Sequence, residues 1–204
     1  MSSYIAIIDS GGANLTSLIM AIERLGAAAI VTDDRDTIMN AGQVILPGVG
    51  AAGFAMQRLA EKKLTVLIPE LRQPVLGICL GMQLLCAHSE EGNTDCLGII
   101  PLQVKKIQQA PFVPHMGWNT LLLTESASES ILSAITTGDN FYFVHSYAVQ
   151  AEARYTLATA SHGEMFAACI RYRNFYGVQF HPEKSGQSGA RLLASFLGSG
   201  RSSL

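Results

Sequence analysis

A cysteine lies between two glycines in the stretch PVLGICLGMQLL, residues 74–85. An apolar run typical of a buried strand gives way at Leu80 to a helical pattern, so Cys79 falls at a strand-to-helix corner. Gly77 and Gly81 are spaced as in the G-x-S-x-G nucleophile elbow of hydrolases, with cysteine in place of serine. Free N–H groups at a helix start would stabilise a thiolate and a developing oxyanion. We therefore predict that Cys79 is a nucleophile; a buried structural cysteine is the alternative.

A cysteine nucleophile needs a base, and the base needs an orienting partner. Among five histidines, His181 has the most suitable context, because an apolar strand ends there in the stretch GVQFHPEKS. Pro182 favours an extended backbone at His181, and residues two apart in an extended segment point the same way. Glu183 could therefore hold the His181 ring. We predict a hydrolytic triad of Cys79, His181 and Glu183, although His-Pro-Glu alone is equally typical of a surface turn.

A second glycine-rich turn, LPGVGAAG at residues 46–53, follows another predicted strand. It has no phosphate-binding lysine, which disfavours a nucleotide-binding loop. Its bare backbone can bring the N–H groups of Val49 and Gly50 close to a reacting carbonyl, beside the N–H of Leu80. We predict that these three residues form an oxyanion hole. Without Cys79, a purely structural turn would be the preferred interpretation.

The composition limits the class of protein. The 204 residues include 49% hydrophobic and 15% charged residues, which predicts a single domain over residues 1–204 with a large buried interior. The net charge of -2 and the lack of a long basic run predict no nucleic-acid partner. No stretch reaches the roughly 18–20 apolar residues of a membrane span. We expect a cytoplasmic protein with free thiols and, because no C-x-x-C pair occurs, no metal site.

Strand-like runs alternate with helical patterns in the first half of the chain. The predicted strands are 4–9, 28–32, 43–48 and 74–78, and the predicted helices are 14–26, 35–41, 54–71 and one beginning near Leu80. This alternation predicts an α/β fold with a mostly parallel sheet and helices on both faces. The second half predicts further strands at 97–108, 119–124, 140–149, 154–160 and 164–180, and a final helix at 187–197.

Three motifs together resemble the class I, triad-type glutamine amidotransferases: Pro47 to Gly50, Gly77 to Leu84, and His181 to Glu183. The resemblance extends over essentially the whole chain and implies a flavodoxin-like, mostly parallel sheet with added antiparallel strands. It also implies hydrolysis of glutamine to glutamate and ammonia without a cofactor. Cys79 would attack the carboxamide carbon, His181 would transfer protons, and water would cleave the resulting thioester.

Two further stretches, VPHMGWN at 113–119 and YFVHSY at 142–147, resemble the glutaminase subunits of imidazole glycerol phosphate synthase in histidine biosynthesis. This resemblance implies a heterodimer with a separate (β/α)8 cyclase subunit, which would receive the ammonia. The residues implied for glutamine binding are Gly50, Gln83, Glu91, Ser146 and Tyr147. Those implied for the subunit interface are Asn14, Trp118 and Lys184. The first loop, DSGGAN, departs from the family's usual Asp-Tyr-Gly-x-Gly-Asn, so contacts around residues 10–14 are the least certain.

Other interpretations stay open at this point. A glutaminase serving pyridoxal phosphate synthase or anthranilate or aminobenzoate synthase would share the triad, but it would not explain VPHMGWN. A cysteine peptidase or a deglycase-like protein would not explain Gln83 and the His-Pro-Glu ending. A non-catalytic docking module would not need an intact triad.

Overall fold

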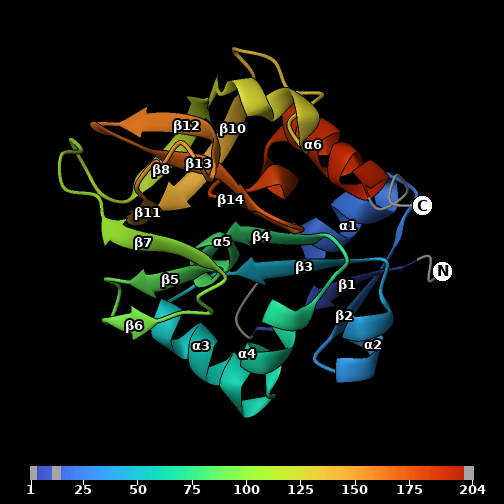
Figure 1. Ribbon diagram of the computed structural model, residues 1–204. Helices are drawn as coiled ribbons and strands as arrows, with labels where there is room; N and C mark the ends of the chain where they lie inside the picture. Colours follow the sequence, from blue (N-terminus) through green and yellow to red (C-terminus); the bar gives the residue numbers. More distant parts are fainter. Residues whose placement is uncertain (1–3, 11–14, 200–204) are drawn as a thin grey trace.

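The computed structural model describes residues 4–10 and 15–199 and contains a large mixed sheet between layers of helices (Figure 1). Four parallel strands in the order β2-β1-β3-β4 form its first half. They are β1 (Tyr4–Ile8), β2 (Ala28–Thr32), β3 (Gln43–Gly48) and β4 (Val75–Cys79). The strand β14 (Phe175–Val178) pairs in parallel with β4, so the stretch that leads to His181 lies beside the strand that ends at Cys79. The predicted fold class is confirmed.

The second half of the chain extends this sheet with mainly antiparallel strands, as expected. Beyond β14 the order is β13, β11, β7, β5 and β6, while β12 pairs with β13 and β9. These strands are β5 (Cys86–Ser89), β6 (Thr94–Asp95), β7 (Ile100–Lys106), β9 (Leu122–Leu123), β11 (Tyr147–Val149), β12 (Thr156–His162) and β13 (Glu164–Tyr172). A separate antiparallel pair is formed by β8 (His115–Thr120) and β10 (Asn140–His145).

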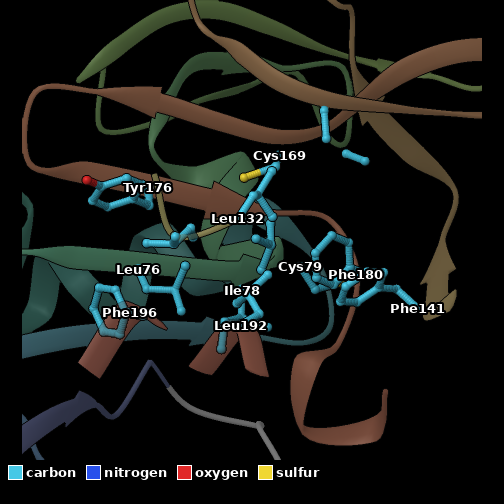
Figure 2. Close-up of a cluster of buried hydrophobic side chains, with 14 of the residues drawn as sticks. Leu76, Ile78, Cys79, Leu132, Phe141, Cys169, Tyr176, Phe180, Leu192 and Phe196 are labelled. Carbon is cyan, nitrogen blue, oxygen red and sulfur yellow. The ribbon is translucent and has the colours of Figure 1, made fainter. Parts of the chain in front are cut away.

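Helices cover both faces of the sheet because its strands are apolar on both sides. On one face Ile5 and Ile7 of β1 pack with the helices α1 (Thr16–Arg24) and α6 (Gly186–Ser199); on the other, Ala6 and Ile8 pack with α2 (Arg35–Asn40), α3 (Ala52–Glu61) and α4 (Leu64–Leu67). The remaining short elements are α5 (Leu80–Leu84), η1 (Ile68–Glu70), η2 (Glu125–Glu129) and η3 (Pro182–Lys184). Figure 2 shows the first core, in which Leu76 of β4 lies near Phe196 of α6. No helix in the described part of the chain is long and apolar enough to cross a membrane.

The long helix predicted over 54–71 is wrong in its extent. The chain forms α3, turns at Lys63 with φ 57°, and then forms the short α4 and η1. A left-handed residue ends an α-helix, and Pro69 lacks the N–H that a continuing helix would need.

The strands predicted over 140–149 and 119–124 are each two strands in different sheets. At Ser146 the chain leaves β10, which pairs with β8, and enters β11, which pairs with β7 and β13. Likewise β8 pairs with β10, whereas β9 pairs with β12. Ser146 therefore lies at the junction of the two sheets.

Candidate active site

Cys79 lies at the corner between β4 and α5, with φ 54° and ψ -110°. The two neighbouring glycines permit this turn by close approach of the backbone. A Cβ atom at Gly81 would collide with the carbonyl oxygen of Leu46, and one at Gly77 would lie 2.7 Å from the backbone of Gly81. The corner is therefore packed against β3 and can be built only with glycine at both positions. Because α5 has five residues, individual N–H groups rather than a long helix dipole face the sulfur.

The sulfur of Cys79 is mostly buried and has polar neighbours. It lies 3.7 Å from the carbonyl oxygen of Val144 and 3.8 Å from the amide nitrogen Nε2 of Gln179. His181 forms a further hydrogen bond with the Cys79 side chain. The nucleophile and base of the predicted triad are thus within contact of each other.

His181 has the extended backbone expected before a proline, with φ -101° and ψ 96°. Its Nδ1 lies 2.8 Å from Oε1 of Glu183 in the turn η3, and both side chains are about nine-tenths buried (9% and 10% exposed). The other carboxylate oxygen, Oε2, is buried with no hydrogen-bond partner in the described part of the chain.

The charge state of His181 reflects two opposing effects. Burial alone would lower the pKa of the ring, but hydrogen bonds to Cys79 and Glu183, with the charges of those groups, raise the pKa to about 9. A raised pKa favours an imidazolium beside a thiolate at neutral pH. Such a pair suits nucleophilic attack followed by protonation of a leaving group.

A pocket of ≈ 380 Å³ opens onto Cys79. Its lining includes all of the predicted oxyanion and substrate residues: Val49, Gly50, Leu80, Gln83, Glu91, Ser146 and Tyr147. His145, His181 and Lys184 also line it. The structure therefore brings together residues from β3, β4, the segment between β10 and β11, and η3 (Figure 1). In the described residues no cluster of three or more His, Cys, Asp or Glu side chains could hold a metal ion.

Gln83 and Glu91 differ in how they are held. Gln83 Nε2 donates hydrogen bonds to the carbonyl oxygen of Tyr147 at 2.9 Å and to Oε1 of Gln179 at 3.0 Å. Glu91 uses Oε2 to accept the N–H of Ala52, at the start of α3, at 2.8 Å. Glu91 therefore fastens the end of the glycine-rich turn to the wall of the pocket.

The predicted interface residues lie around the mouth of this pocket or outside the described residues. Trp118 on β8 is 59% exposed and makes an edge-to-face contact with Tyr142 on β10. Lys184 lines the pocket from η3. Asn14 lies outside the described residues, as does most of the atypical loop DSGGAN.

Two residues near the site were not singled out by the sequence analysis. Gln179 lies two positions before His181, so the alternation rule used for Glu183 could have found it. His145 lines the pocket because the chain changes sheets directly after it, and no local pattern signals that change.

Comparison with known proteins agrees with this geometry. A sequence model of the family described as "Glutamine amidotransferase class-I" matches residues 6–198. The chain is 50% identical over 195 residues to the "Imidazole glycerol phosphate synthase subunit HisH" of Idiomarina loihiensis, with 95% of this chain and 96% of that protein covered. It is 47% identical to the HisH subunit of Pectobacterium atrosepticum, with 95% and 98% covered. The chain belongs to the HisH family of class I glutamine amidotransferases.

Solved structures of this class share the fold at low sequence identity. A putative GMP synthase glutaminase-type chain from Thermoplasma acidophilum has a TM-score of 0.76 at 21% identity, with 99% of this chain and 96% of that chain covered. A glutamine amidotransferase from Thermotoga maritima has a TM-score of 0.70 at 15% identity, and both chains are fully covered. The amidotransferase fold is thus retained where few residues are identical.

Proposed function

We propose that this HisH-family chain hydrolyses L-glutamine with Cys79, His181 and Glu183 and delivers the ammonia to a cyclase subunit. The observation that supports this most strongly is the hydrogen-bonded series from the Cys79 sulfur to His181 and on to Glu183, at one pocket. A nucleophile, a base and an orienting carboxylate in contact are the parts that acyl transfer requires.

In the first half-reaction the Cys79 thiolate attacks the carboxamide carbon of glutamine. The resulting oxyanion accepts hydrogen bonds from the N–H of Leu80 and from the Val49-Gly50 turn. Imidazolium at His181 gives its proton to the leaving nitrogen, so ammonia departs and a glutamyl thioester remains.

In the second half-reaction water attacks the thioester. Neutral His181 takes a proton from the water, the C–S bond breaks, and the regenerated thiolate again faces an imidazolium. Glutamate then leaves. Glu183 holds Nδ1 of His181 throughout, which keeps Nε2 directed at the reacting atoms.

The amino-acid end of glutamine is held by the remaining lining residues. The carbonyl oxygen of Gln83 and the carboxylate of Glu91 suit an α-ammonium group, and backbone N–H groups at Gly50, Ser146 and Tyr147 suit an α-carboxylate. These groups would select a free amino acid rather than a residue within a peptide.

The partner in this proposal is a (β/α)8 cyclase subunit, with which the chain forms a heterodimer through the surface around Trp118 and Lys184. The cyclase converts a phosphoribosyl-formimino intermediate and ammonia to imidazole glycerol phosphate and aminoimidazole carboxamide ribotide in histidine biosynthesis. The HisH relatives are named as subunits of that synthase. Four free cysteines suit the reducing cytoplasm, where we place the complex.

The Val49-Gly50 peptide is the proposed switch of this glutaminase. Gly50 has φ 88°, and no atom lies within 4 Å of where its Cβ would be, so the peptide has room to rotate. Docking of the partner with its ribotide would turn the Val49-Gly50 N–H toward the oxyanion. Hydrolysis without an acceptor for ammonia would then be slow.

Glutamate release from glutamine tests the proposal. It is measured for the chain alone, with purified cyclase subunit, and with cyclase subunit plus its ribotide ligand. We expect strong stimulation only in the third case, abolished by Cys79→Ala. Turnover that ignores the cyclase would assign the chain to another acceptor pathway, and ribotide conversion with glutamine by Cys79→Ser at the normal rate would indicate a docking module.

A further inference from the structure

Two buried histidines lie directly opposite each other on the two strands of the smaller sheet. His115 of β8 and His145 of β10 form a cross-strand pair, and Nδ1 of His115 lies 3.0 Å from Nε2 of His145. Phe143 stacks on His115, and Phe166 meets His145 edge-on. The triad uses neither histidine, so this polar contact inside an aromatic cluster needs a separate explanation.

The hydrogen bonds give this pair one direction. Nδ1 of His145 lies 2.9 Å from the carbonyl oxygen of Tyr147, which can only accept, so Nδ1 carries the proton. Burial lowers the pKa of His145 to about 3, so its ring is neutral and Nε2 is an acceptor. Nδ1 of His115 must then donate to it. His115 thus fixes the tautomer in which His145 holds Tyr147.

The carbonyl group held by His145 also holds a residue of the glutamine site. Gln83 Nε2 donates to the same Tyr147 oxygen at 2.9 Å and to Oε1 of Gln179 at 3.0 Å. Both N–H groups of the Gln83 amide are therefore used. Its own oxygen is the group left for the pocket, and an oxygen there suits a positively charged donor.

We propose that His145 is a positioning residue for glutamine binding: with His115 behind it, His145 fixes the Tyr147 carbonyl and, through that carbonyl, the orientation of the Gln83 amide. This inference rests on the proposed function, because it assigns a role within the same site. His145 lies where the chain passes from one sheet to the other, so it also ties the strand β8, which carries exposed Trp118, to the pocket.

Two substitutions at His145 separate this role from simple packing. In His145→Asn the side-chain amide nitrogen can reach the place of Nδ1 and donate to Tyr147. In His145→Gln the amide lies nearer the place of Nε2, and the bond to Tyr147 is lost. The two variants remove the same ring, so a packing role predicts equal effects.

Binding of L-glutamine is measured by calorimetry in the complex with ribotide and the cyclase subunit, with Cys79→Ala in every sample to prevent turnover. We expect His145→Gln to raise Kd about tenfold and His145→Asn to raise it less than about threefold, the difference that one buried hydrogen bond makes. With Cys79 restored, KM should follow Kd, while kcat changes less than about threefold. Equal Kd values for the two variants, or a fall in kcat at unchanged KM, would overturn the inference.

His115→Phe provides a second route if the substitutions at His145 do not fold. A phenyl ring keeps the stacking on Phe143 but leaves Nε2 of His145 without its donor, so Kd for glutamine should rise about threefold or more. An unchanged Kd in the folded His115→Phe complex contradicts the inference alone. If the Cys79→Ala parent itself does not bind glutamine, the proposed function fails and the inference falls with it.

Discussion

At the residue scale, the backbone of Cys79 adopts φ 54° and ψ -110°, values close to those of the first central residue of a type II′ turn. Glycine favours this conformation, and other residues are strained in it by about 1–3 kcal/mol. The strain persists because Gly81 is packed against Leu46 and the corner cannot relax. The reactive sulfur is thus presented at the expense of stability.

This strain leads to a prediction about two inactive variants. Cys79→Gly should be more stable than Cys79→Ala by about 1 kcal/mol, because relief of strain exceeds the extra chain entropy of glycine. Denaturant unfolding of both variants measures the difference. A Cys79→Ala variant as stable as Cys79→Gly would show that the corner stores no strain.

The raised pKa of His181 predicts a pH dependence of hydrolysis. His181 must carry a proton to release ammonia, so kcat/KM should fall as the pH rises through about 9. Glu183→Gln removes a negative charge from the ring, which lowers the pKa of His181. In the stimulated complex we expect the alkaline limb of Glu183→Gln to move to lower pH and kcat to fall roughly 10–100-fold. A limb that stays in place would exclude Glu183 as the orienting partner.

At the element scale, the corner between β4 and α5 is built against β3. Gly81→Ala should lower the free energy of unfolding by at least about 2 kcal/mol, because the added methyl group meets the backbone of Leu46, which cannot move aside. Gly198→Ala in α6 is the matched control, since its Cβ meets nothing within 4 Å and alanine favours a helix. Equal stabilities of the two variants would contradict this packing.

The same scale shows what the sequence can predict. The strands of the first half and the corner at Cys79 were predictable because apolar runs, glycine spacing and helix starts are local signals. The break between β10 and β11 at Ser146 was not, because apolar and polar residues alternate through it without interruption. Nor was the pairing of His115 with His145, which depends on the register of two strands far apart in the chain.

At the scale of the whole molecule, several large apolar side chains are exposed on and just before β8. Phe112, Met116 and Trp118 are more than half exposed. Neighbouring Pro114 and Lys184 line the pocket, so this surface lies beside the route by which ammonia would leave. Exposed apolar groups that gather in one region are typical of a protein–protein interface.

Trp118→Ala should weaken the complex with the cyclase subunit about 10–100-fold, because a large aromatic side chain at an interface contributes strongly to affinity. Its thermal stability should not change, since the side chain is mostly exposed in the free chain. Titration of the cyclase subunit, with glutamate release as the readout, measures the affinity. Leu122→Ala, at an exposed residue on β9, serves as the control. Equal affinities for the two variants would exclude the surface around Trp118.

The most direct test of the account follows the amide nitrogen itself. Glutamine labelled with heavy nitrogen in its side-chain amide is given to the complex of this chain, ribotide and the cyclase subunit, in a large excess of unlabelled ammonium. We predict that the imidazole product carries the label in proportion to the glutamate formed, and that Cys79→Ala yields only unlabelled product. Label lost to the solvent, with unlabelled product formed at the same rate, would contradict transfer of ammonia from this chain to its partner.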